Sequence, residues 1–203
     1  MNRNQANQLL VEFHTPQHIR RHCHQVARVA EFLANALAKK GVIVNPTTAW
    51  IGGKIHDFVR VVDFKAIAEN SGTTEEHRFW EELRNNYKGW HHADAGAEIL
   101  WKRGEFILAS IVKKHKTIAI LSENPPHTWE EKLVYYADKR VSHDQIRSLV
   151  ERLDEAYKRH HGDKPMTSEE KRCLAAIQKL EEEIFKPLSL TPDSILSLNK
   201  MIE

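Results

Sequence analysis

The sequence has few cysteines, no long apolar run and no excess of charge of either sign. Its two cysteines, Cys23 and Cys173, form no CxxC spacing, which argues against a thiolate zinc site and favours a reduced, cytoplasmic setting. No apolar stretch approaches the roughly 20 residues of a membrane span, so we expect no membrane association. The first residues lack the apolar segment of a secretory signal. The 30 basic and 28 acidic residues are interspersed, so we expect no nucleic-acid partner.

Histidine, by contrast, is abundant, with 13 residues in a chain of 203. The hydrophobic fraction of 41% is ordinary for a globular protein, and this length can bury a core without disulfides. The histidines are therefore the first indication of a metal site.

The spacing of apolar residues is helical almost throughout. Thr15-Pro16 is typical of a helix start, and apolar residues then recur at alternating spacings of four and three until Gly41. Asn45-Pro46 opens a second helix, and segment 115–121 could be extended. Further helices are expected at 63–70, 74–87, 91–103, 105–116, 128–141, 143–160, 168–185 and 192–202.

This pattern predicts an all-α bundle, because no stretch alternates in the way that a sheet requires. Residues 161–165 look like a linker, and the segment from 143 onward is richer in Glu and Lys. We expect a metal-binding helical domain at 1–142 and a C-terminal helical extension at 143–203 packed on it. That extension offers a surface for a homodimer.

The pair His56-Asp57 stands at the end of an apolar run in KIHDFVR. Neighbouring side chains in a helix point about 100° apart and rarely bind one ion together. At a frayed helix end both side chains can serve as metal ligands, and a carboxylate can bridge two ions. The second such pair, His143-Asp144, follows Ser142 and precedes Gln145, which together read as a capping box that starts a helix.

Further candidates lie on apolar faces. His115 shares the face of Ile111 and Val112, and Asp138 lies one turn from Val134. An ionised carboxylate on such a face is costly unless it is paired or binds a metal. His92 has Gly96 one turn later, which leaves space for a substrate, a metal or another helix.

The helix that begins near residue 16 carries three more histidines. His24 lies well off the centre of the apolar stripe, so it either borders a cleft or is solvated. His18 and His22 have the i, i+4 spacing of a zinc pair, but no third partner is evident, and we interpret them as a solvated face.

Five stretches together resemble the HD-domain metal-dependent phosphohydrolase superfamily: HQVARVA from His24, KIHDFVR, HADAGAEIL from His92, IVKKH ending at His115, and YYADKRV, which contains Asp138. The resemblance covers residues 18–141. It implies an all-α bundle that holds two divalent ions. The implied ligands of the first ion are His24, His56, Asp57 and Asp138, and those of the second are Asp57, as the bridge, His92 and His115.

The resemblance also implies an activity. It is the hydrolysis of a phosphate ester or anhydride of a small molecule, such as a nucleotide or dinucleotide, by a hydroxide shared between the two ions, with Asp57 and Arg60 as catalytic residues. Arg60 replaces a lysine of many relatives and keeps a cation for the phosphate. Phe58 and Val59 depart from the family's Ile-Gly. Lys116 stands where some relatives have a second histidine, which argues against a third metal site.

Other interpretations stay open. Iron is the expected metal, with manganese, nickel or zinc as alternatives. Some relatives with this ligand set are di-iron oxygenases, and a non-catalytic regulatory module would be expected to lack ligands. Segment 61–90 is the natural lid, from which Arg78 and Lys88 could bind phosphate. Alternatively, Trp80 and Trp90 in that segment are core residues. His91 reads as a helix cap or a residue that supports the ligands.

Overall fold

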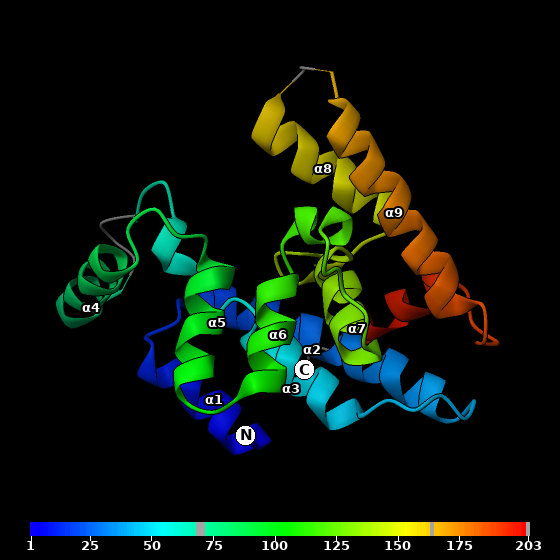
Figure 1. The fold of residues 1–203 in the computed structure, drawn as a ribbon, viewed down its shortest axis with the longest axis horizontal. Coiled ribbons are helices and arrows are strands. Elements are labelled where there is room, and N and C mark those ends of the chain that lie inside the picture. The colour runs from blue at the N-terminus through cyan, green and yellow to red at the C-terminus, as the bar shows by residue number, and fades with distance from the viewer. Residues whose placement is uncertain (68–71, 163–164, 202–203) are drawn as a thin grey trace.

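The computed structural model describes residues 1–67, 72–162 and 165–201, and their fold is all-α, as the sequence predicts (Figure 1). The elements, in chain order, are α1 Arg3–Glu12, α2 Gln17–Ala38, α3 Pro46–Ile55, the 3₁₀ helix η1 Arg60–Asp63, α4 Thr74–Asn86, α5 His92–Lys102, α6 Phe106–Lys114, η2 Thr117–Leu121, α7 Trp129–Asp138, β1 Val141–Ser142, β2 Gln145–Ile146, α8 Leu149–His161, α9 Ser168–Phe185 and η3 Pro192–Met201. Among the described helices, none is both long and apolar enough to cross a membrane.

Helix α2 forms the centre of the bundle and packs against α3 and α7. Its apolar stripe is buried, as its periodicity predicts. Gly53 allows the close approach of α3, because a Cβ atom there would lie 2.8 Å from the Cα atom of Ala27. The same region places the carbonyl of Gly53 where His56 can bond to it.

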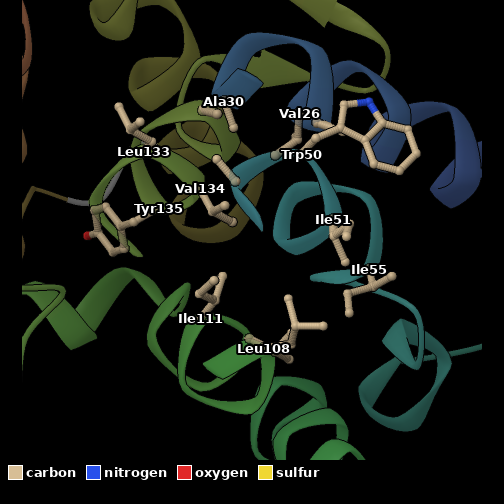
Figure 2. Close-up of a cluster of buried hydrophobic side chains, with 14 of the residues drawn as sticks. Val26, Ala30, Trp50, Ile51, Ile55, Leu108, Ile111, Leu133, Val134 and Tyr135 are labelled. Carbon is tan, nitrogen blue, oxygen red and sulfur yellow. The ribbon is translucent and has the colours of Figure 1, made fainter. Parts of the chain in front are cut away.

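The core is shared between four helices (Figure 2). Val26 comes from α2, Ile51 and Ile55 from α3, Ile111 from α6 and Val134 from α7. Because these apolar faces pack together, one end of each of α3, α6 and α7 is brought toward the same point beside α2.

The start of the chain differs from expectation in two ways. Residues 3–12 form α1, which the sequence analysis did not predict, and Asn2 and Gln5 make its capping box. Thr15 does not cap α2, whose N-cap residue is Pro16. The Thr15 hydroxyl donates instead to the carbonyl of Phe58, at 2.7 Å, and so ties the chain before α2 to the turn after the His-Asp pair.

The prediction that residues 143–160 form one helix is wrong at its start. Val141–Ser142 and Gln145–Ile146 pair as an antiparallel hairpin, and His143 lies in its turn with a φ of 55°. The capping box that starts α8 is made by Ser148 and Glu151, six residues after the predicted box at Ser142.

Three other segments differ from the prediction or lie partly outside the described residues. Residues 115–121 are not extended, because 117–121 form η2. The helix predicted at 63–70 is not seen in residues 63–67, where only the end of η1 is helical, and residues 68–70 lie outside the described ones. Of the predicted linker at 161–165, residues 163–164 lie outside them too.

The C-terminal helices pack on the bundle through α9, which contacts α7 and η2. Ile177, Leu180 and Ile184 of α9 are buried. Arg140, fully buried, bonds to the Tyr136 hydroxyl and to the Glu181 carboxylate, and so joins the end of α7 to α9. In Figure 1, α8 and the start of α9 lie at the top of the view, away from α1.

Candidate metal centre

Six side chains of the metal-ligating types gather where the helices of the bundle end. His56 and Asp57 directly follow α3, His92 begins α5, His115 directly follows α6, and Asp138 ends α7. The sixth, His22, comes from within α2. The frayed end that the His-Asp pair needs is therefore present, since the helix stops at Ile55.

The first group consists of His22, His56 and Asp138, whose ligating atoms all lie within 4.8 Å of one another. The Asp138 Oδ1 atom is 3.0 Å from His22 Nε2 and 3.5 Å from His56 Nε2. These atoms surround one point, as ligands of a single ion would.

The second group consists of Asp57, His92 and His115, all buried. Asp57 Oδ1 lies 2.9 Å from His92 Nε2 and 3.2 Å from His115 Nε2. The other oxygen, Oδ2, lies 3.7 Å from His56 Nε2, in the first group. The two oxygens of Asp57 therefore face the two groups.

Each of the four imidazoles is held by an acceptor at its Nδ1 atom. The acceptors are the carbonyl of His143 for His22 (2.9 Å), the carbonyl of Gly53 for His56 (2.8 Å), Asp63 Oδ2 for His92 (2.7 Å) and the carbonyl of Val112 for His115 (2.6 Å). When Nδ1–H donates to such a partner, Nε2 carries a lone pair and no proton. All four Nε2 lone pairs then point at the acidic centre, which is how proteins orient imidazole ligands of a metal.

The electrostatics of the centre favour a bound cation. Burial would raise the pKa of Asp57, but His56 and His92 outweigh it and hold that pKa well below its usual range. The same holds for Asp138. Burial would raise its pKa, but Lys139 and the neighbouring histidines outweigh it and lower the pKa well below the usual value. Burial lowers the pKa of His115 to about 4, so this imidazole is neutral at pH 7. Burial would also lower the pKa of His56 and of His92, but Asp57 outweighs it and raises both. A divalent cation would therefore take the place of the protons on these nitrogens, beside two ionised carboxylates.

The donor set fits a divalent metal. Within the described chain, His56 Nε2 and Asp57 Oδ1 are buried and have no hydrogen-bond partner. Buried polar atoms without partners are costly, and a metal ion would satisfy both. Imidazole and carboxylate ligands together suit transition metals such as iron, manganese, nickel and zinc better than calcium.

The structure does not bring His24 to the centre, so that expectation needs correcting. His24 is exposed, and partial desolvation by its neighbours, followed by the cations Lys54 and Arg28, lowers its pKa. His22, interpreted from the sequence as part of a solvated face, takes the place expected of His24. A signal was present: at 100° per residue, His22 lies about 40° from Val26 around the helix, whereas His24 lies about 160° from it.

Asp63 was missed by the sequence analysis and supports His92. Its Oδ2 atom accepts both from His92 Nδ1 and, at 3.0 Å, from the His92 backbone N–H. Its Oδ1 atom is paired with Arg60. Burial would raise the pKa of Asp63, but the bonds from His92 outweigh it and lower the value to about 2. The only signal was its position one turn after Arg60, which does not distinguish it from a surface acid.

The departure Phe58-Val59 is explained by packing against Gly96. A Cβ atom at residue 96 would lie 2.9 Å from the Phe58 ring, 3.1 Å from Val112 and 3.3 Å from Val59. The space that Gly96 leaves is thus filled by side chains of the protein, not by a substrate or a metal. Phe58 also packs edge-on against Phe13, with the ring centres 4.9 Å apart.

The other residues singled out from the sequence are not ligands in this centre. Arg78 and Lys88 are exposed, and neither lines the cavity described below. Trp80 is a core residue, as one interpretation held, whereas Trp90 is 47% exposed. His91 caps α5, as proposed, by accepting at Nδ1 from the N–H of Ala93.

A third group of possible ligands, Asp63, His91 and His92, does not make a further site. His92 already uses Nδ1 to bond Asp63, and His91 uses Nδ1 as the helix cap, which leaves its proton on Nε2. Lys116 supplies no ligand either, because its ammonium group pairs with Asp94 at 2.8 Å.

A cavity of about 450 Å³ opens onto the centre. Asp57, His92, His115 and Asp138 lie in its wall, and its cations are Arg60, Lys116, Lys139 and Arg152. Lys139 donates to Asp138 Oδ2 at 2.6 Å and to the carbonyl of His115 at 2.9 Å, and so stands beside the ligands. A basic cavity of this size suits a small anion.

The comparisons with known proteins agree with this geometry. The family model described as "HD domain" matches residues 19–142, which is more than half of the chain. The chain belongs to the HD-domain family. Members of the HD-domain family are generally metal-dependent hydrolases of the phosphohydrolase superfamily, which bind divalent metals through His and Asp residues. No curated protein and no solved structure matches the chain.

Proposed function

We propose that this HD-domain protein hydrolyses a phosphate ester or anhydride of a small molecule, a nucleotide or dinucleotide being the leading candidate, with two divalent ions. The observation that carries the proposal is the arrangement of six ligating side chains around Asp57, whose two oxygens face two groups of ligands. The open, basic cavity beside them favours an enzyme over a regulatory module.

In the proposed site, His22, His56 and Asp138 would hold one ion, and His92 and His115 would hold the other, with Asp57 shared between the two groups. Two bound divalent ions supply a water of lowered pKa and a clamp for the phosphoryl oxygens. Iron is the expected metal, with manganese, nickel or zinc as alternatives. The fixed Nδ1 bonds keep the four imidazoles oriented, so little reorganisation is needed when metal binds.

Arg60 is the proposed phosphate ligand. Its side chain is 31% exposed, lines the cavity and has Nε 3.8 Å from Asp57 Oδ2. Asp63 holds Nη1, which fixes the guanidinium beside the centre and leaves its other donors for phosphate oxygens. Arg60 would therefore position the phosphate, and Asp57 would hold the ions next to it.

The test is anaerobic purification, metal analysis and a screen of phosphate esters and nucleotides. The variant is Asp57→Asn, which keeps the shape and removes the charge, and the matched control is Asp154→Asn on the exposed face of α8. We expect hydrolysis by the wild type and by Asp154→Asn, and at least a hundredfold loss in Asp57→Asn. Absence of hydrolysis across the panel, or an Asp57→Asn protein as active as the wild type, would contradict the proposal.

Di-iron oxygenase chemistry is the second candidate, because the same ligand types suit an iron pair. It is distinguished by oxygen consumption in the iron-loaded protein with phosphonate and polyol substrates. Oxygen uptake that depends on the substrate would favour it, and phosphate release in the absence of oxygen would favour hydrolysis.

A further inference from the structure

A second cavity, of about 430 Å³, lies beside the metal cavity. The two share four lining residues: Thr117, Asp138, Lys139 and Arg152. Because Asp138 belongs to the metal centre and also lines the second cavity, a small molecule bound at the centre could extend directly into that cavity.

The second cavity is lined mainly by apolar side chains of the C-terminal helices. They are Leu153, Ala156 and Tyr157 of α8, Cys173, Leu174 and Ile177 of α9, with Ile118 of η2 and Met166 before α9. On α8 they follow the i, i+3, i+4 spacing of one helix face, and on α9 Ile177 lies one turn after Cys173 and Leu174. These two helices lie outside the residues that match the family model, so the chain's C-terminal extension supplies most of the apolar lining of the cavity.

The apolar faces around this cavity are incompletely covered. Ile177 and Cys173 are buried, but Leu153, Leu174 and Met166 are only half-buried. A small molecule that removed these side chains from water would gain binding free energy in proportion to the apolar area covered.

The charges around the cavity favour one orientation of a bound ligand. Lys139 and Arg152 line both cavities and stand where the two meet. Glu169 and Glu170, in the first turn of α9, line only the apolar cavity. A phosphate is therefore attracted to the metal side and repelled from the α9 side, which leaves the apolar space for the uncharged part of the ligand.

We propose that the substrate of the metal centre is a phosphate ester with a largely apolar organic group, such as an alkyl, aryl or nucleobase group, which occupies the cavity between η2, α8 and α9. The phosphate end of this inference rests on the proposed function. The apolar end rests on the lining of the second cavity alone.

The test measures binding of phosphonates, which are not hydrolysed. Methyl-, butyl- and hexylphosphonate are titrated into the manganese-loaded protein by calorimetry. Burial of each added methylene is worth roughly a three- to fourfold gain in affinity. Hexylphosphonate should therefore bind at least a hundredfold more tightly than methylphosphonate.

Two variants locate the effect. Leu153→Gln places an amide in the cavity, and Ala156→Phe fills it, so each should reduce the gain with chain length to less than tenfold. Val150→Gln, on the exposed face of the same helix, is the matched control and should keep the full gain. Melting temperatures show that each variant is folded, and either cavity variant alone is sufficient if the other unfolds.

The results separate this inference from the proposed function. Equal affinities for the three phosphonates, or an undiminished gain in a folded Leu153→Gln or Ala156→Phe protein, would overturn the inference even if the enzyme hydrolyses phosphate esters. A steep gain that the cavity variants abolish would support it even if no ester is hydrolysed, in which case the proposed reaction is the part that fails.

Discussion

The Nε2 atoms of His92 and His115 face each other at 3.0 Å. In the neutral rings the Nδ1 protons are donated elsewhere, to Asp63 and to the Val112 carbonyl, so the two Nε2 atoms face each other with lone pairs. Two lone pairs at this distance repel unless a cation lies beside them. Asp57 Oδ1, within 3.2 Å of both atoms, completes a group that is arranged for a metal.

This arrangement predicts that divalent metal stabilises the fold. At a free metal concentration about 100 times Kd, one bound ion adds about 2.7 kcal/mol to the free energy of unfolding. For a domain of this size that corresponds to a rise in Tm of about 5–10 °C. Scanning calorimetry with manganese and with a chelator measures it. Asp57→Asn should lose most of the rise in Tm, and Asp154→Asn should keep it. A Tm that is the same with manganese and with chelator would contradict the prediction.

A second prediction distinguishes the two histidines of α2. His22→Ala removes a ligand and should lower metal affinity about tenfold or more, since even changes in the residues that support ligands cost this much. His24→Ala, two residues along the same helix, alters an exposed side chain and should leave affinity within twofold of the wild type. Metal titration of the two proteins measures the difference. The reverse order of effects would restore His24 as the ligand.

A third prediction concerns phosphate binding. Arg60→Ala should raise KM for the best phosphate ester about tenfold or more, because a charged hydrogen bond is worth about 1.5–3 kcal/mol. Arg78→Ala should change KM little, because Arg78 is exposed and does not line the cavity. Metal content must be measured alongside, since Arg60 also pairs with Asp63. A KM that depends on Arg78 and not on Arg60 would place the phosphate elsewhere.

Much of the site could be predicted because its side chains belong to short motifs at helix ends. His56 and Asp57 stand where an apolar run stops, and His115 and Asp138 stand on apolar faces that can be read from spacing. The choice between His22 and His24 could also have been made from helix angles, since His22 lies about 60° from Ile19 and His24 about 140° from it.

The remaining features depend on how distant segments meet. Asp63 reaches His92 because η1 turns the chain back toward the start of α5, which no local pattern in 60–63 indicates. The carbonyl of His143 reaches His22 only because β1 and β2 form a tight hairpin, with a positive φ at a residue that is not glycine. In both cases the partner is chosen by tertiary structure, so a pattern within one segment cannot reveal it.

A buried ion pair fixes the opposite end of the helix that carries Asp138. The Lys114 ammonium group lies 3.0 Å from Glu131, and both side chains are buried. Glu131 also accepts from the Ser110 hydroxyl and from the backbone N–H groups of His127 and Thr128, at the start of α7. Burial would raise the pKa of Glu131, but these donors outweigh it and leave the pKa lowered.

The last prediction follows from that lowered pKa. Glu131→Gln leaves Lys114 buried without its counter-charge and should lower the free energy of unfolding by about 3 kcal/mol at pH 7. A carboxylate with a lowered pKa stabilises fully above its unfolded pKa, about 4.3, and this stabilisation is lost as pH falls through the folded value. The gap between wild type and variant in urea denaturation should therefore narrow below about pH 4. Glu183→Gln, in an exposed pair with Lys132, should cost less than about 1 kcal/mol, and a gap that stays constant with pH would contradict the argument.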